Sequence, residues 1–131
     1  MDPAQLESLC AQARAVADRA YAPASNFHVG AALLSTDGRT FVGCNVENSS
    51  YGLTVCAERN AVARAVADGA RDFEAVVVYT QLSSPGSPCG ACRQVLAEFS
   101  PNMRVVLIGD GEERVDTTLD ALLPRAFRFD H

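Results

Sequence analysis

Two short runs of apolar, mostly β-branched residues dominate the second half of the chain. They read EAVVVYT (residues 74–80) and MRVVLI (residues 103–108), and such runs favour buried strands. Each run follows a segment with helical character. VCAERNAVARAVAD, from about residue 55 to 68, is rich in alanine and stops at Gly69, and PCGACRQVLAEF is bounded by Pro88 and Pro101. Helices that alternate with apolar strands predict a layered α/β domain with a mixed sheet.

The remaining segments extend this pattern. Apolar residues between Leu6 and Ala20 have helical spacing, and YAPASN then breaks the helix. FHVGAALLSTDGRTFVGCNVEN predicts two strands around an Asp37-Gly38 turn. GDGEERV predicts a turn into a short edge strand, and TTLDALLPRAF a short helix with a tail. The predicted order α-β-β-α-β-α-β-β-α gives a five-stranded mixed sheet in an α/β/α arrangement. With 131 residues, of which 48% are hydrophobic, we expect one domain over residues 1–131.

Charge and composition limit the kinds of binding partner and the cellular location that we expect. The net charge is −5, and all 11 basic residues are arginines that form no basic run. Proteins that bind nucleic acid usually display a basic face, so a polynucleotide substrate is disfavoured. No stretch approaches the ~18 apolar residues that a membrane span requires. The beginning, MDPAQLESLC, does not resemble a signal peptide, and we therefore expect a cytoplasmic protein.

Three of the five cysteines are spaced like metal ligands. Without a secretory signal, disulfides are a poor default. The pair Cys89-x-x-Cys92 is ambiguous alone, because it fits a redox dithiol, half of a zinc site or a chance pair. Cys56 lies 33 positions before Cys89 and also opens a predicted helix, where free N–H groups stabilise thiolates. Three thiolates around Zn²⁺ leave one tetrahedral position for water, as in a catalytic site.

Other candidate ligands are less favoured. Cys44 could close the site as a fourth cysteine and make the metal structural, but its apolar FVGC strand favours packing. Cys10 lies on the apolar face of the first predicted helix and is expected in the core. Of the two histidines, His28 falls within a predicted strand, and His131 is the last residue.

Glu58 requires a geometric condition before it can share a site with Cys56. Two residues along a helix correspond to about 200° of rotation, so the side chains diverge unless Cys56 precedes the first turn. The alternative is a solvated carboxylate that interacts with the helix dipole. Together, however, C-A-E and P-C-x-x-C form the signature of zinc-dependent nucleobase deaminases, in which the glutamate is a general acid and base.

The chain resembles the small homotetrameric zinc-dependent cytidine deaminases along nearly its whole length. The resemblance is carried by YAPASNFHVGAALL, GCNVENSSYGLTVCAERNA, SPCGACRQVLAEF and LLPRAF, in that order. It implies the cytidine deaminase-like fold and one Zn²⁺ per subunit, held by Cys56, Cys89 and Cys92. It also implies hydrolysis of cytidine and deoxycytidine to uridine, deoxyuridine and ammonia, in pyrimidine salvage. A zinc-activated water would attack while Glu58 moves the protons.

The same resemblance implies roles for further residues. Asn45 and Glu47 would bind the ribose hydroxyls, Phe27 would pack on the pyrimidine, and backbone groups near Ala57 and Ser87 would hold the polar edge of the base. Two arginines would donate hydrogen bonds to cysteine sulfurs, namely Arg59 and Arg93. Two aromatic residues would line the pocket of a neighbouring subunit in a homotetramer with shared active sites, namely Tyr51 and Phe127.

Two other functions remain open at this point. A related deaminase acting on a nucleoside antibiotic such as blasticidin S would share the zinc centre and differ near the sugar. A non-catalytic, zinc-stabilised interaction module would use Cys44 as the fourth ligand and leave Glu58 on the surface.

Overall fold

Five strands form one mixed sheet in the computed structural model, which describes residues 1–129. The strand order is β2-β1-β3-β4-β5, with β3 and β4 parallel and the other neighbours antiparallel. The strands are β1 (Val29–Ser35), β2 (Thr40–Cys44), β3 (Phe73–Thr80), β4 (Arg104–Ile108) and β5 (Arg114–Thr118). The predicted five-stranded mixed sheet is confirmed.

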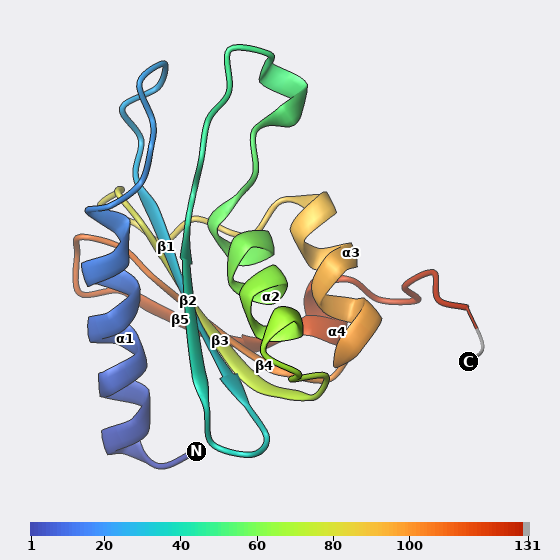
Figure 1. The fold of residues 1–131 in the computed structure, drawn as a ribbon. Coiled ribbons are helices and arrows are strands. Elements are labelled where there is room, and N and C mark those ends of the chain that lie inside the picture. Colours follow the sequence, from blue (N-terminus) through green and yellow to red (C-terminus); the bar gives the residue numbers. More distant parts are fainter. Residues whose placement is uncertain (130–131) are drawn as a thin grey trace.

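Helices cover both faces of the sheet, as the α/β/α prediction requires (Figure 1). One face carries α1 (Pro3–Ala17), and the other carries α2 (Ala57–Ala67) and α3 (Gly90–Phe99). Two shorter elements are the 3₁₀ turn η1 (Tyr51–Leu53) and α4 (Leu119–Leu122). Among residues 1–129, no helix combines the length and apolar character that a membrane span needs.

The apolar runs are explained by burial on both faces. Side chains alternate across a strand, so β3 sends Val76 and Val78 into the core beneath α2 and α3, and Val77 into the core beneath α1. The side chains of β1 alternate in the same way. Ala31 and Leu33 lie in the core beneath α2 and α3, and Ala32 and Leu34 lie in the core beneath α1. Strands buried on both faces lose the apolar–polar alternation of a half-exposed sheet.

The crossover between β3 and β4 positions the part of the chain that contains the paired cysteines. Parallel neighbours cannot be joined by a tight turn, and here the connection is the loop 81–89 followed by α3. α2 packs on the same face as α3. Both helices therefore begin near the carboxyl end of β3, although their first residues are far apart in sequence.

The end of the chain differs from the prediction. The last helix was expected to begin at Thr117, but Thr117 and Thr118 belong to β5 and pair with Val105 and Arg104. Their β-branched side chains suit the extended edge strand. The helix α4 keeps only four residues, anchored by the buried Leu119. His131 lies outside the described residues.

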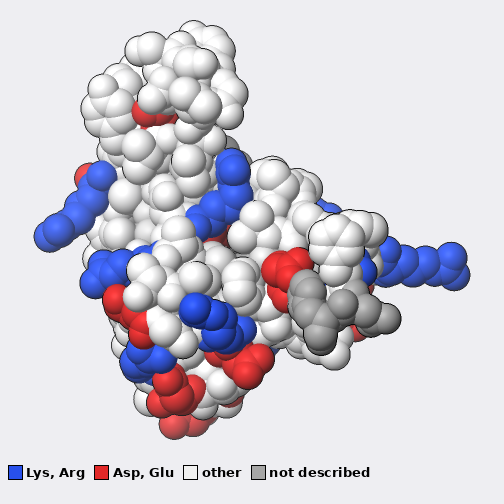
Figure 2. Space-filling model, turned by 45° about the vertical axis from the view of Figure 1, so that its right-hand side comes forward, with Lys and Arg blue, Asp and Glu red and all other residues white. Residues whose placement is uncertain are grey.

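Two loops project together beyond one end of the sheet (Figure 1). They are residues 18–28, after α1, and residues 45–56, between β2 and α2, and isolated bridges join Tyr21 to Val46 and Val46 to Val55. Figure 2 shows that this projecting end carries little charge on the face drawn, whereas positive and negative side chains are interspersed below it. The loops expose several large apolar side chains, namely Tyr21, Val46, Tyr51 and Leu53.

Candidate active site

The two helices on the same face of the sheet each begin immediately after a cysteine. Cys56 is the N-cap of α2 and Cys89 is the N-cap of α3, and both have extended backbone angles. Cys92 lies in the first turn of α3 and is fully buried. The condition set for Cys56 is therefore met, since it precedes the helix and its side chain need not diverge from that of Glu58.

The three sulfur atoms form a compact cluster. Cys56 Sγ lies 3.9 Å from Cys89 Sγ, Cys89 Sγ lies 3.4 Å from Cys92 Sγ, and all three lie within 4.8 Å of one another. Tetrahedral zinc with Zn–S bonds of about 2.3 Å would separate its sulfur ligands by about 3.8 Å. The donor type and the spacing both fit Zn²⁺, and among residues 1–129 no other histidine, cysteine or carboxylate joins this cluster.

The electrostatics of the cluster favour a bound cation. The hydrogen bond with Cys92, and then the guanidinium of Arg59, lower the pKa of Cys56 to about 5. The same contact with Cys56, together with burial, raises the pKa of Cys92. One thiolate thus disfavours the next, because like charges at this separation repel. A divalent cation would allow all three sulfurs to carry negative charge.

Glu58 is a buried carboxyl group beside this cluster. It lies in the first turn of α2, and its exposed fraction is only 5%. Burial raises the pKa of Glu58, and the nearby Cys56 adds to the increase. The alternative of a solvated surface carboxylate is therefore wrong. A buried carboxyl with a raised pKa can both accept and donate protons near neutral pH.

A cavity of about 230 Å³ is lined by Glu58, by two of the three cysteines, Cys56 and Cys89, and by four other predicted residues. Those four are Phe27, Asn45, Ala57 and Ser87. The remaining lining was not predicted and comes mainly from apolar or threonine side chains near strand ends, namely Val29, Thr54, Val78 and Thr80. The position of Val78 and Thr80 at the carboxyl end of β3 is the signal that could have found them, since ligands in α/β sheets bind beyond that end.

Asn45 and Glu47 both hold the loop that carries Phe27. The side-chain oxygen of Asn45 accepts the backbone N–H of Val29 at 2.9 Å, and its amide nitrogen donates to the Phe27 carbonyl at 2.8 Å. Glu47 does not line the 230 Å³ cavity; it lines a separate hollow with Tyr51, and the two hollows share no lining residue. The Ser25 hydroxyl, and then the backbone N–H of Ala24, hold the pKa of Glu47 below its usual value.

The two predicted arginines behave differently. Arg59 donates from Nη2 to Cys56 Sγ at 3.7 Å, as expected, and its buried Nε has no partner among the described residues. Arg93 was expected to do the same, but its hydrogen bonds in residues 1–129 go to oxygen atoms. It donates to the carbonyls of Pro88 at 2.8 Å and Leu122 at 2.7 Å, and to the Ser87 hydroxyl at 2.7 Å. Arg93 thus connects the loop before Cys89 to α4.

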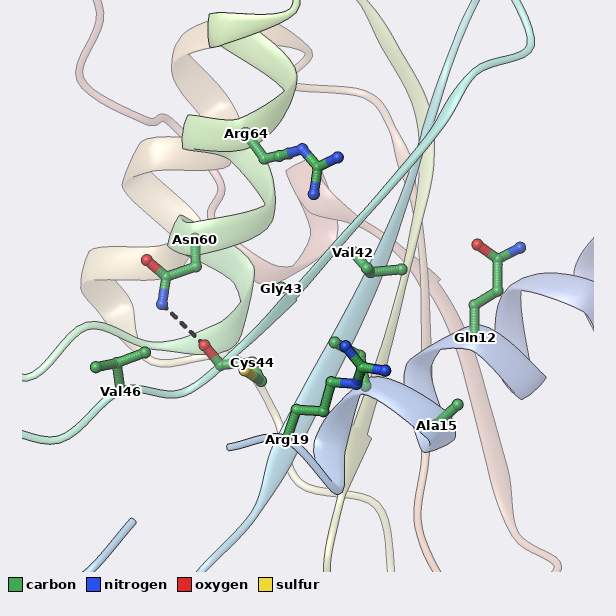
Figure 3. A pocket seen from close by; sticks show the side chains of 10 residues that line it. Gln12, Ala15, Arg19, Val42, Gly43, Cys44, Val46, Asn60 and Arg64 are labelled. Carbon is green, nitrogen blue, oxygen red and sulfur yellow. Dashed lines mark hydrogen bonds between the residues drawn. The ribbon is translucent and has the colours of Figure 1, made fainter. Parts of the chain in front are cut away.

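A larger groove lies elsewhere and contains Cys44 (Figure 3). It measures about 650 Å³ and runs along β2 between α1 and α2, with Arg19 and Arg64 on opposite sides. Cys44 is half-buried there rather than fully packed, and its carbonyl accepts a hydrogen bond from Asn60 at 2.8 Å. Because Cys44 belongs to this groove and not to the sulfur cluster, the cluster remains open to a non-protein ligand.

Three thiols at two helix N-termini, with a buried carboxyl in a small cavity, define a metal-dependent hydrolase site. Comparison with known sequences agrees. Residues 3–108 match the family described as the cytidine and deoxycytidylate deaminase zinc-binding region, and the chain belongs to this family. Its members bind zinc, and Cys56, Cys89 and Cys92 are the residues that can hold this ion here.

Individual relatives support the assignment over most of the chain. A cytidine deaminase of Sporosarcina psychrophila is 49% identical over 123 residues, which cover 93% of this chain and 90% of that protein. The crystal structure of a cytidine deaminase from Burkholderia pseudomallei superimposes with a TM-score of 0.91 at 47% identity, covering 97% of this chain and all of that one. A blasticidin-S deaminase of Bacillus cereus is 32% identical over 105 residues, 74% of each chain.

Proposed function

We propose that the protein hydrolyses cytidine and deoxycytidine to uridine and deoxyuridine with release of ammonia, as a step of pyrimidine salvage. The observation that carries this proposal is the buried Glu58 carboxyl in the same cavity as Cys56 and Cys89. A metal-activated water and a proton carrier are the two requirements of this hydrolysis, and one cavity contains groups for both.

Zinc bound by the three cysteines would lower the pKa of a water molecule and so supply the nucleophile at neutral pH. Glu58 accepts a proton from that water and delivers it to ring atom N3, which makes C4 more electrophilic. Once the water oxygen has bonded to C4, Glu58 accepts the second proton of that oxygen and carries it to the exocyclic amine, so that the C4–N bond breaks and ammonia leaves. The raised pKa of Glu58 suits both transfers, because the carboxyl can be reprotonated within each cycle.

Arg59 would strengthen the bound zinc as a Lewis acid. Three thiolates around Zn²⁺ give a net charge of −1, which weakens the metal as a Lewis acid. The guanidinium near Cys56 Sγ withdraws charge from that sulfur and so counteracts the effect. The Nε of Arg59 has no hydrogen-bond partner within residues 1–129, so a further donor is available at the same place.

The cavity lining supports the proposed nucleoside contacts. Phe27 packs on the pyrimidine, backbone groups near Ala57 and Ser87 hold the polar edge of the base, and Asn45 approaches the ribose. In this proposal Glu47, which lines the hollow beside Tyr51, also binds the sugar. A carboxylate offers about four lone-pair positions, so Glu47 can still accept from a ribose hydroxyl while it holds Ser25 and Ala24.

We further propose a homotetramer in which neighbouring subunits share active sites. Tyr51 and Phe127 are 80% and 68% exposed, which is unusual for large aromatic side chains and fits insertion into another subunit. Tyr51 lies on the weakly charged projecting end seen in Figure 2. Light scattering would test the assembly, and a monomer in solution would contradict it.

The main alternative is a deaminase for a nucleoside antibiotic, which the similarity to a blasticidin-S deaminase favours. One assay separates the proposals, namely ammonia release from cytidine, deoxycytidine and blasticidin S, with zinc content measured on the same sample. We expect turnover of the two nucleosides and about one zinc per subunit. Turnover of blasticidin S alone would select the alternative, and zinc without any turnover would select a non-catalytic module.

A further inference from the structure

The backbone that carries Phe27 makes an unusual turn just before it. Asn26 adopts a left-handed conformation with φ of +54°, which few residues other than glycine adopt readily. Its backbone N–H donates to the Ala22 carbonyl at 2.8 Å. Because the chain changes direction at Asn26, the position of the Phe27 ring depends on what holds the residues on either side of this turn.

Ser25 holds the turn from one side through a single oxygen atom. Its hydroxyl donates to the Glu47 carboxylate, and the same Oγ accepts the backbone N–H of Phe27 at 3.0 Å. Glu47 also accepts the backbone N–H groups of Ala24 at 2.9 Å and Ser25 at 3.2 Å. Glu47 therefore reaches Phe27 only through the Ser25 hydroxyl among these contacts.

Asn45 holds the turn from the other side. Its amide donates to the Phe27 carbonyl and accepts from the Val29 N–H. The backbone N–H and the carbonyl of Phe27 are thus both fixed by side chains, one from Ser25 and one from Asn45. Phe27 is only partly buried in the described chain, so core packing alone does not fix its ring.

We propose that Ser25 is a positioning residue that couples the sugar-binding carboxylate of Glu47 to the placement of Phe27 against the base. This inference rests on the proposed nucleoside deaminase function. Without the Ser25 hydroxyl, Glu47 can still accept the backbone N–H groups of Ala24 and Ser25, but the Phe27 N–H loses its partner. The Phe27 ring is then free to move. A ring that contacts the substrate equally in the ground state and in the transition state affects KM more than kcat.

The test compares Ser25→Ala and Ser25→Thr with a matched control, Ser50→Ala. Ser50 is an exposed serine on the adjacent loop, and its side chain forms no cap hydrogen bond. We expect Ser25→Ala to raise KM for cytidine about tenfold while kcat changes less than about twofold, the effect of losing one hydrogen bond. Ser25→Thr keeps the hydroxyl and should restore KM to near the wild-type value, and Ser50→Ala should not change it.

A double-mutant comparison shows whether Ser25 acts through Phe27. In a Phe27→Leu background, Ser25→Ala should change KM by less than about twofold, because the aromatic ring that Ser25 positions is already absent. Equal effects in both backgrounds would overturn the proposal, as would a wild-type KM in Ser25→Ala.

Amide hydrogen exchange provides a readout that does not need activity. Exchange at the Phe27 N–H should accelerate at least tenfold in Ser25→Ala, while exchange at Asn60 in α2 stays unchanged. An unaltered exchange rate at the Phe27 N–H would contradict the proposed role of the Ser25 hydroxyl.

Turnover of cytidine by the wild type tests the proposed function separately. An active wild type together with an unaffected Ser25→Ala variant would therefore refute only this inference. If Ser25→Ala does not fold, the near-isosteric Ser25→Cys replaces it with the same expected rise in KM, because a thiol is a weak donor.

Discussion

The sulfur atoms of Cys56 and Cys89 lie 3.9 Å apart, although each precedes a different helix and 33 positions separate them. This relationship makes the metal site a link between α2 and α3. Replacing Cys89 by alanine should therefore remove zinc and lower the melting temperature. Elemental analysis and calorimetry on the purified variants measure both quantities.

Cys44→Ala is the matched control for that experiment, because Cys44 lies in the separate groove along β2. It should keep about one zinc per subunit. Full zinc content in Cys89→Ala, or loss of zinc in Cys44→Ala, would contradict the assignment of the ligands.

Glu58→Gln should separate chemistry from metal binding. The amide is nearly isosteric and cannot carry the protons, so turnover of cytidine should fall by about 10³-fold or more while zinc content is kept. Glu112→Gln, at an exposed loop position, should leave turnover unchanged. Steady-state assays with zinc analysis decide the outcome, and near-normal turnover in Glu58→Gln would remove Glu58 from the mechanism.

Arg59→Ala should keep zinc and lower kcat/KM by about 10- to 100-fold, the usual effect of removing a group that supports a metal ligand. The reason is that the donor to Cys56 Sγ is lost. Arg64→Ala on the same helix is the control, since the one ion pair that its guanidinium forms within residues 1–129 is with Asp68, at 3.9 Å. If both variants had equal activity, the guanidinium would have no role at the metal.

Glu47 should make the stability of the protein depend on pH. Its pKa is lower in the folded chain than the ordinary value of about 4.3, because the Ser25 hydroxyl and backbone N–H groups bind the carboxylate. The folded state therefore binds this proton less readily than the unfolded state. The stabilisation is complete above the unfolded pKa and is lost as pH falls through the folded pKa.

Melting temperatures of the wild type and Glu47→Gln test the direction of this pH dependence. The wild type should have the higher melting temperature at pH 7, and the difference in melting temperature should shrink as pH falls from about 5 to 3. Glu112→Gln should show no such trend. A constant difference across this range would mean that the charge of Glu47 does not contribute to folding.

Gly43 should be intolerant of any side chain. A Cβ atom there would lie 2.4 Å from the Ala61 nitrogen and 2.5 Å from the Ala57 carbonyl oxygen, because β2 packs directly against the α2 backbone. Gly43→Ala should lower the free energy of unfolding by about 3 kcal/mol, the upper range for overpacking. Gly52→Ala meets nothing within 4 Å and should change it little. Denaturant titration compares the two, and similar values would disprove the close packing.

Sequence periodicity predicted most of the fold because it reports which side chains are buried. It placed all five strands and the three main helices, and it placed Cys56 at a helix start. The end of the chain was misjudged because Thr117 and Thr118 were read as part of the following helix, while pairing with β4 holds them in an edge strand. A short segment has too few residues for periodicity to outweigh such pairing.

Arg93 shows a second limit of the sequence. The family resemblance implied a bond from Arg93 to a cysteine sulfur, yet its hydrogen bonds within the described chain go to Ser87, Pro88 and Leu122. A long, flexible side chain can reach several partners, and spacing along the chain does not choose among them. Arg59 kept its predicted partner because Cys56 lies one helical turn away.

The sequence by itself determined the order of the main elements, the three cysteines that are candidates to hold a metal, and the family to which the chain belongs. Only the tertiary structure decided that three sulfurs from two helices meet, that Glu58 is buried beside them, and that Cys44 is excluded. The physical reason is that periodicity and motifs are local properties. The meeting of Cys56 with Cys89 depends instead on the crossover from β3 to β4 and on the packing of α2 and α3 on one face of the sheet.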